Sequence, residues 1–246
     1  FDEKVTDIPF FISMSSWLHG LNTTMGQTFF ESVAHILSDG DKREFTSGAG
    51  RAGVLQITSQ QKKAASDIIT KLSNSEATPN LDNSNSLLFV PDTPPFTNAI
   101  DFSADVFLET NDEIIAIELK SVKPNSGEMR GEKQKILEGK AALYRHYPGK
   151  DIKFYIGFPF DPTTDPNDPT SYDKVRFTAS IINMDKYFDH REVLLASELW
   201  DYLSGDTSTM EQILSIINSI ATPTFMADFA FLCDNSNRNI DKQRYR

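Results

Sequence analysis

The sequence predicts a single α/β domain in which helices cover a mixed β-sheet. The predicted elements run in the order helices, hairpin, helix, strand, loop, strand and helices, which is typical of a sheet packed under helices. The chain has 246 residues, 39% hydrophobic and 24% charged, an ordinary composition for one globular domain. No internal repeat or clear linker is visible. We therefore treat residues 1–246 as one domain, with N-terminal helices at 1–75, a core hairpin and following helix at 98–160, and a C-terminal helical part at 185–246.

The first forty residues are predicted to be helical. Apolar residues recur there at helical spacing in two runs, one around Phe10–Leu21 and one from Met25 to Leu37, and Gly40 stops the second. Residues 56–72 predict a further helix. Residues 73–99 are rich in Ser, Asn, Asp, Pro and Thr and predict a long loop, broken by a short strand at Leu87–Val90.

Residues 101–123 predict a β-hairpin with a two-residue turn at Asn111-Asp112. This register places Asp105 opposite Glu118, Phe107 opposite Ala116, and Ser103 opposite Lys120. Strand alternation then puts Asp105, Glu118 and Lys120 on one face. The other face has the character of a core face and carries Val106, Leu108, Ile115, Ile117 and Leu119.

The chain after the hairpin alternates between turns and regular elements. Ser126 in the turn at 123–127 is a candidate cap for a helix from Glu128 to Tyr147. A strand at Ile152–Phe160, a loop at 161–173 and a strand at Arg176–Ile182 follow. Helices are predicted at 189–204 and 208–220, and the apolar segment 225–232 is expected to be buried.

The net charge of −11 argues against a nucleic-acid partner, because phosphate binding needs a basic surface. Local counts weaken that objection. Residues 118–145 hold seven Lys or Arg against four Glu, a net of 7 − 4 = +3, and residues 238–246 hold four against one Asp, a net of 4 − 1 = +3. Charge alone leaves two interpretations open, namely a basic cleft in an acidic body, or ordinary solvated helix faces.

Cellular location follows from similar bulk features. No apolar run approaches the roughly 20 residues that span a bilayer, and no signal peptide is visible. The single cysteine, Cys233, cannot form an internal disulfide and is expected to be a buried structural thiol. We therefore expect a cytoplasmic protein without a membrane partner.

Asp105 and Glu118 form the strongest candidate site. Carboxylates directly opposite each other in a hairpin repel by up to about 1 kcal/mol, and a divalent cation relieves this better than Lys120 alone. Phosphodiester hydrolysis needs such a hard cation to activate water, and a lysine can orient that water or stabilise developing charge. A solvent-facing strand with ordinary charge alternation explains the same pattern without any function.

Two further carboxylates compete for a place in this site. Glu31 lies in an apolar helix and could supply a third carboxylate, although such a residue is more often the solvent edge of an amphipathic helix. Asp101 would lie on the same strand face as Asp105 and would replace it if the register shifted by four residues.

Other motifs carry little weight. Gly48-Ala49-Gly50-Arg51-Ala52-Gly53 matches a Gly-x-Gly-x-x-Gly pattern, but the polar stretch 41–47 before it does not read as a buried strand, so we expect a plain or basic loop and no dinucleotide site. The histidines at 19, 35, 146 and 190 lack zinc-ligand spacing.

Asp105 together with Glu118-Leu119-Lys120 resembles the motif of the PD-(D/E)XK nuclease superfamily, with Ala104 where the proline of the name would stand. The stretch from Ile117 to Ile136 resembles the TdeIII-type group of Type II restriction endonucleases more specifically. So do residues 153–160 and residues 193–203, the latter with Glu198-Leu-Trp. The likeness covers roughly residues 100–220.

This resemblance implies a PD-(D/E)XK-type core, Mg²⁺-dependent double-strand cleavage of DNA, and a homodimer on a short palindrome, for which the group is associated with GGNCC. It implies that Asp105 and Glu118 bind Mg²⁺, that the Leu119 carbonyl is an extra ligand, and that Lys120 positions or activates water. Candidate phosphate contacts follow the hairpin at Lys123, Asn125, Arg130, Lys133 and Lys135. The alternatives are a repair or structure-specific nuclease of the same superfamily, and a non-catalytic DNA-binding module on the same fold.

Overall fold

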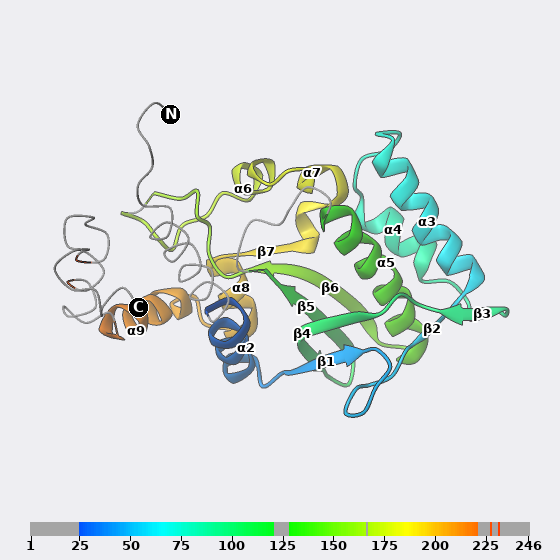
Figure 1. The fold of residues 1–246 in the computed structure, drawn as a ribbon, viewed down its shortest axis with the longest axis horizontal. Coiled ribbons are helices and arrows are strands. Elements are labelled where there is room, and N and C mark those ends of the chain that lie inside the picture. The colour runs from blue at the N-terminus through cyan, green and yellow to red at the C-terminus, as the bar shows by residue number, and fades with distance from the viewer. Residues whose placement is uncertain (1–24, 121–127, 166, 221–226, 228–230, 232–246) are drawn as a thin grey trace, which may run out of the picture.

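The computed structural model describes residues 25–120, 128–165, 167–220, 227 and 231 (Figure 1). The helix expected around Phe10–Leu21, the Ser126 cap and Cys233 lie outside these residues, as does most of the segment 225–232. Within the described ranges, no helix has the length and apolar character needed to cross a membrane.

A mixed five-stranded sheet forms the centre of the molecule, as the sequence predicts. Its strands lie in the order β1-β4-β5-β6-β7. Strands β1, β4 and β5 are antiparallel to one another, and β5, β6 and β7 are parallel. The carboxyl ends of the three parallel strands therefore meet at one edge of the sheet. The bounds are β1 (Asp41–Phe45), β4 (Phe102–Glu109), β5 (Glu113–Leu119), β6 (Asp151–Phe158) and β7 (Val193–Leu195).

The predicted hairpin register is confirmed. Phe107 pairs with Ala116 and Glu109 with Ile114, which leaves the turn at 111–112. The expectation of one core face is incomplete, because Phe107 and Ala116 on the opposite face are also buried. Both faces of this hairpin are therefore buried.

Helix α5 (Glu128–His146) crosses one face of the sheet, and α8 (Ser197–Ser204) lies on the other. A Cβ on Gly139 of α5 would lie 2.8 Å from the Phe154 ring, so this helix approaches the sheet where it has no side chain. Gly157 comes three residues after Phe154 in β6, so it lies on the opposite face of the sheet. A Cβ on Gly157 would lie 3.2 Å from the Leu199 side chain of α8. Figure 1 shows α3 (Ser59–Ser73) and α4 (Leu81–Leu88) beyond α5, away from the sheet.

Strand β4 gains one extra residue beside β1. Asp41 pairs with Phe107 and Arg43 with Ala104, so two steps along β1 (43 − 41) match three along β4 (107 − 104). The extra residue falls in the stretch that contains Asp105. Such bulges re-aim side chains and often lie next to functional sites.

The polar segment before the glycine-rich loop forms a strand, which the sequence did not predict. Strand β1 is the edge of the sheet, and only Phe45 within it is fully buried. An edge strand needs few apolar residues, so its sequence resembles that of a loop. The Gly48–Gly53 loop follows it and leads to the short strand β2 (Gln56–Thr58), so no strand-turn-helix unit for a dinucleotide exists here.

The predictions for residues 73–99 and 176–182 are wrong. The strand at Leu87–Val90 is instead the end of α4, whose first turn is capped when Asn80 accepts a hydrogen bond from the Asn83 amide. The region 73–99 also contains β3 (Phe96–Asn98), which pairs with β2 in a small separate sheet. The strand at Arg176–Ile182 is helix α6 (Lys174–Ser180), which begins where Asp173 accepts from the Arg176 amide. Local capping by Asn and Asp side chains decided both helices.

The helix predicted at 189–204 is divided into three parts. A single 3-10 turn, η2 (His190–Glu192), precedes β7, and α8 starts only after Ala196. The tertiary pairing of β7 with β6 overrides the helical pattern of the sequence. The remaining helices are η1 (Met25–Phe30), α2 (Glu31–Ser38), α7 (Met184–Tyr187) and α9 (Thr209–Ile220), of which α9 matches its prediction closely.

A buried ion network fixes α5 beneath η2. Lys133 and Lys140 of α5 are 1% and 2% exposed, and both ammonium groups contact the carboxylate of Glu192, which is 0% exposed. Lys140 also donates to Asn85 Oδ1 of α4 at 3.2 Å. Burial, and then the neighbouring charge of Lys133, lower the pKa of Lys140 to about 8 despite the attraction of Glu192. Lys133 and Lys140 share the single carboxylate of Glu192, so we expect the loss of Glu192 to destabilise the network most.

We expect Glu192→Gln to lower the free energy of unfolding by about 3–5 kcal/mol, because it leaves two buried ammonium groups unpaired. Lys140→Met should be neutral or stabilising at pH 7, because Lys133 still neutralises Glu192. Urea unfolding of both variants measures the difference. A Lys140→Met loss as large as that of Glu192→Gln would contradict this view of the network.

The difference in stability between the wild type and Lys140→Met should depend on pH. Since the pKa of Lys140 is about 8 in the folded protein and its ordinary value is 10.5, the unfolded chain binds more protons between these pH values. The stability of the wild type relative to Lys140→Met should therefore rise from pH 8 to pH 10. A constant difference across that range would show that Lys140 does not lose its proton early.

Candidate active site

Two neighbouring strands bring Asp105 and Glu118 together at the edge where β5 ends. Asp105 Oδ2 accepts a hydrogen bond from the Leu119 amide at 2.9 Å, next in sequence to Glu118. The side chains of Asp105 and Glu118 are only 10% and 16% exposed. Asp101, the alternative first carboxylate, lies exposed ahead of β4. The geometry therefore favours Asp105 as the partner of Glu118.

Lys120 lies between the sheet and the start of α5. Its ammonium nitrogen is 3.3 Å from Glu118 Oε1 and 3.3 Å from Glu132 Oε1, and 3.6 Å from Glu128 Oε1. Ser103, predicted to lie opposite Lys120, donates to the other oxygen of Glu118 at 3.3 Å. The lysine is thus held by carboxylates from two elements. Glu132 and Glu128 come from α5, and sequence patterns gave no sign that they would reach Lys120.

Helix α2 and strand β1 complete the site on the other side of Asp105. Lys42 Nζ lies 2.8 Å from Asp105 Oδ1 and 3.1 Å from Glu31 Oε2. His35, one helical turn after Glu31, donates from Nε2 to the Asp105 carbonyl at 2.6 Å. The structure thus places Glu31 beside Asp105. Lys42 and His35 were missed, because the pairing of β1 with β4 that brings Lys42 close has no signal in a polar edge strand.

These side chains form a carboxylate cluster with an excess of negative charge. Its members are Glu31, Asp105, Glu118, Glu128 and Glu132, with Lys42, Lys120 and Lys135 as their cations. The formal sum over these residues is 3 − 5 = −2. The site is therefore short of positive charge by the amount that one divalent cation carries.

The pKa values of the cluster reflect this shortage. Burial, followed by the charge of Asp105, raises the pKa of Glu118 to about 7 although Lys120 is adjacent. Burial and Asp105 also raise the pKa of Glu31. Burial alone would lower the pKa of Lys120, but the charges of Glu118 and Glu132 outweigh it and raise that pKa. Lys120 is therefore suited to donate hydrogen bonds as an ammonium group.

The donor set fits a hard cation. Carboxylates of Asp105 and Glu118 and the Leu119 carbonyl are the oxygen ligands that Mg²⁺ prefers. Over the described part of the chain, no three His, Cys, Asp or Glu side chains stand open together as a ready metal-binding group. The contacts explain this, because Lys42 joins Glu31 to Asp105 while Lys120 joins Glu118 to Glu132. The carboxylates are divided into two groups, each already bridged by an ammonium group.

The residues predicted to contact phosphate differ in position and burial. Lys123 and Asn125 lie outside the described residues. Arg130 is exposed on α5 and reaches Ser73 Oγ at 3.4 Å, and the Lys135 side chain is 41% exposed beside Glu132. Lys133 is buried on Glu192, so the prediction that it contacts phosphate conflicts with its position. A helix of this kind presents successive residues on different faces, which the local charge count could not separate.

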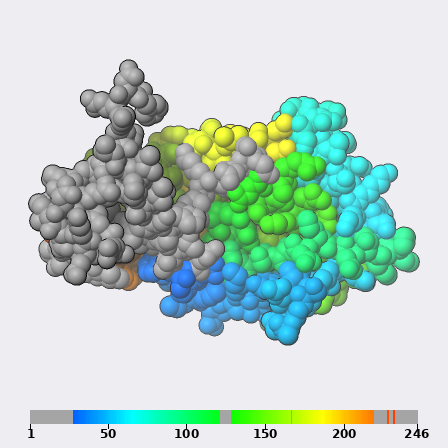
Figure 2. Space-filling view, in the orientation of Figure 1, coloured from blue at the N-terminus to red at the C-terminus, as the bar shows by residue number. Residues whose placement is uncertain are grey.

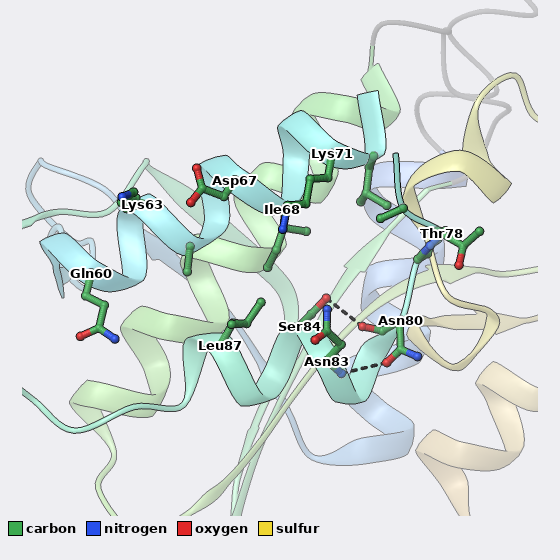
Figure 3. Close-up of a pocket in the computed structure, with 14 residues that line it drawn as sticks. Gln60, Lys63, Asp67, Ile68, Lys71, Thr78, Asn80, Asn83, Ser84 and Leu87 are labelled. Atoms are coloured by element: carbon green, nitrogen blue, oxygen red, sulfur yellow. Dashed lines mark hydrogen bonds between the residues drawn. The ribbon is translucent and has the colours of Figure 1, made fainter. Parts of the chain in front are cut away.

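A separate hollow of about 310 Å³ lies between α3 and the segment that leads into α4 (Figure 3). Lys63, Asp67 and Lys71 of α3 line one side, and Asn80 and Asn83 the other. It shares no residue with the carboxylate cluster and has a single carboxylate, so it lacks the groups for metal-assisted hydrolysis.

Figure 2 shows the green central segments, which include α5, reaching the surface between cyan α3–α4 and the blue α2–β1 segment.

Comparison with known proteins identifies the family. The family model described as "Type II restriction endonuclease, HinfI" matches residues 7–221, which include the whole carboxylate cluster. The Type II restriction enzyme MjaII of Methanocaldococcus jannaschii is 47% identical over 224 residues, which is 90% of this chain and 59% of that protein. The chain thus spans less than two thirds of that relative's length. No solved structure matches.

The sequence motifs resembled the TdeIII-type group, whereas the matching model is that of HinfI. Both are groups of Type II restriction endonucleases, so the broader prediction is confirmed and the finer grouping is not. The matched region contains all five strands of the central sheet and both sides of the site. The chain belongs to the HinfI family of Type II restriction endonucleases.

Proposed function

We propose that this chain cleaves both strands of DNA at a specific site in an Mg²⁺-dependent reaction. The observation that carries the proposal is the grouping of Asp105, Glu118 and Lys120 at the carboxyl edge of β5, with a carboxylate excess that one divalent cation would neutralise. Family membership supports the same chemistry.

Each residue has a role that its contacts support. Asp105, Glu118 and the Leu119 carbonyl would hold Mg²⁺, with Glu31 as a third carboxylate. The bound metal supplies a Lewis acid that lowers the pKa of water and offsets charge at phosphorus. Lys120 is held by Glu118 and Glu132. In the reaction its ammonium group would act on the attacking water or on the phosphate oxygens. In-line attack would leave 5′-phosphate and 3′-hydroxyl ends.

The DNA would lie along the N-terminal part of α5. Arg130 is exposed and Lys135 is partly exposed there, and Lys123 and Asn125 precede the helix in the sequence. Local basic groups are needed because the whole chain carries a charge of −11. A homodimer would place one site on each strand of a palindrome. The GGNCC sequence is the expected target on the basis of the TdeIII-type resemblance.

Lys120→Ala should reduce cleavage of plasmid DNA in Mg²⁺ by at least about a hundredfold, because it removes the donor beside the attacking water. Site-specific binding in Ca²⁺ should remain, since Lys120 reads no base. Gel shift and digestion assays measure the two properties. Lys153→Ala is the matched control, because its ion pair with Glu113 lies at the opposite end of β5. Undiminished cleavage by Lys120→Ala would remove this residue from the mechanism.

Sequencing the ends of a plasmid digest should reveal cuts at one palindrome, with GGNCC expected. Specific bands that appear only with a divalent metal support the proposal. Cuts at junctions, nicks or free ends would indicate a structure-specific or repair nuclease instead. Binding without cutting under any divalent metal would identify a non-catalytic DNA-binding protein instead.

A further inference from the structure

Lys42 bridges two carboxylates that the proposed reaction needs for its metal. Its ammonium nitrogen lies 2.8 Å from Asp105 Oδ1, and 3.1 Å and 3.3 Å from the two oxygens of Glu31. Glu31 is on α2 and Asp105 on β4, and their side chains are 15% and 10% exposed. Two largely buried carboxylates from different elements therefore meet on one cation.

The position of Lys42 is the one that a metal ion would take between these carboxylates. Asp105 Oδ2 already accepts the Leu119 amide, so Oδ1 is the oxygen left for another ligand, and Lys42 contacts it. A divalent cation on Oδ1 and Glu31 would lie within a few ångströms of the ammonium group and repel it strongly. The two cations therefore compete.

Lys42 is also the lysine that can leave. It belongs to the edge strand β1, and its side chain is 39% exposed. Lys120, in contrast, is 18% exposed and held by three carboxylates, two of which come from α5. A long, flexible side chain on an edge strand can move into solvent without disturbing the core.

We propose that Lys42 is a resident cation of the metal site, which holds Glu31 and Asp105 together in the metal-free protein and is displaced when a divalent cation binds. The inference rests on the proposed function, because it assumes that Asp105 is a metal ligand. It assigns Lys42 a positioning role and makes Glu31 a direct member of the metal site.

Lys42→Met tests the displacement directly in the full-length chain without DNA. With no ammonium group to displace, the variant should bind Ca²⁺ about tenfold more tightly by isothermal titration calorimetry, which corresponds to about 1.4 kcal/mol. Its melting temperature in EDTA should fall below that of the wild type, because Glu31 and Asp105 then repel without a counter-ion. Its melting temperature should also rise more on addition of Ca²⁺.

Three further variants separate this role from a purely structural one. Lys42→Arg keeps the cation and should bind Ca²⁺ no more tightly than the wild type. Lys153→Met breaks a comparable ion pair with Glu113 and should leave Ca²⁺ affinity unchanged. The double variant Lys42→Met/Glu31→Gln removes the repulsion, so it should regain melting temperature in EDTA and lose the gain in Ca²⁺ affinity.

The outcomes distinguish the two proposals. If the wild type binds Ca²⁺ and Lys42→Met binds it equally or more weakly, the displacement is overturned while the metal site stands. If the wild type and every variant fail to bind Ca²⁺ or Mg²⁺ at millimolar concentrations, the proposed metal site itself is overturned. Tighter binding by both Lys42→Met and the double variant would remove Glu31 from the site.

Discussion

The hydrogen bond from the Leu119 amide to Asp105 Oδ2, at 2.9 Å, is the contact on which the site depends. The regular pairing of β4 with β5 reaches only Val106 and Ile117, and β4 has its extra residue in the stretch that contains Asp105. A side-chain oxygen thus accepts the amide where the regular ladder ends. This contact fixes the first carboxylate against the backbone that carries Glu118, the Leu119 carbonyl and Lys120, so the ligands are placed by β-sheet geometry and not by a mobile loop.

The second half of the cluster depends on where α5 begins. Glu132 holds Lys120 only because α5 lies close to the sheet, which the absence of a side chain at Gly139 permits. The next residue, Lys133, points away from Lys120 and forms a buried ion pair with Glu192. In this turn of α5, Lys133 therefore anchors the helix through Glu192, and Glu132 orients Lys120, the proposed catalytic lysine. A buried charge network of this kind is costly to break, which makes it an effective anchor.

Local patterns predicted the elements that local forces control. The hairpin, its turn, α5 and β6 were all located from alternation, turn residues and capping positions. The errors fall where packing or a short capping contact outweighs pattern. Strand β1 is polar because it is an edge, and β7 is three residues long and exists through pairing with β6. The segment predicted as a strand at Arg176–Ile182 is mostly helix, and Asp173 caps its first turn.

The sequence by itself determined that Asp105 and Glu118 come close, because a two-residue turn fixes the register in which Val106 pairs with Ile117, one residue from each of them. It could not determine which cations hold that pair. Lys42 is 63 positions from Asp105 (105 − 42), His35 of α2 donates to the Asp105 carbonyl, and Glu31 of the same helix is joined to Asp105 through Lys42. Contacts of that range carry no local periodicity. Only the tertiary structure therefore divided the carboxylates into a group bridged by Lys42 and a group bridged by Lys120.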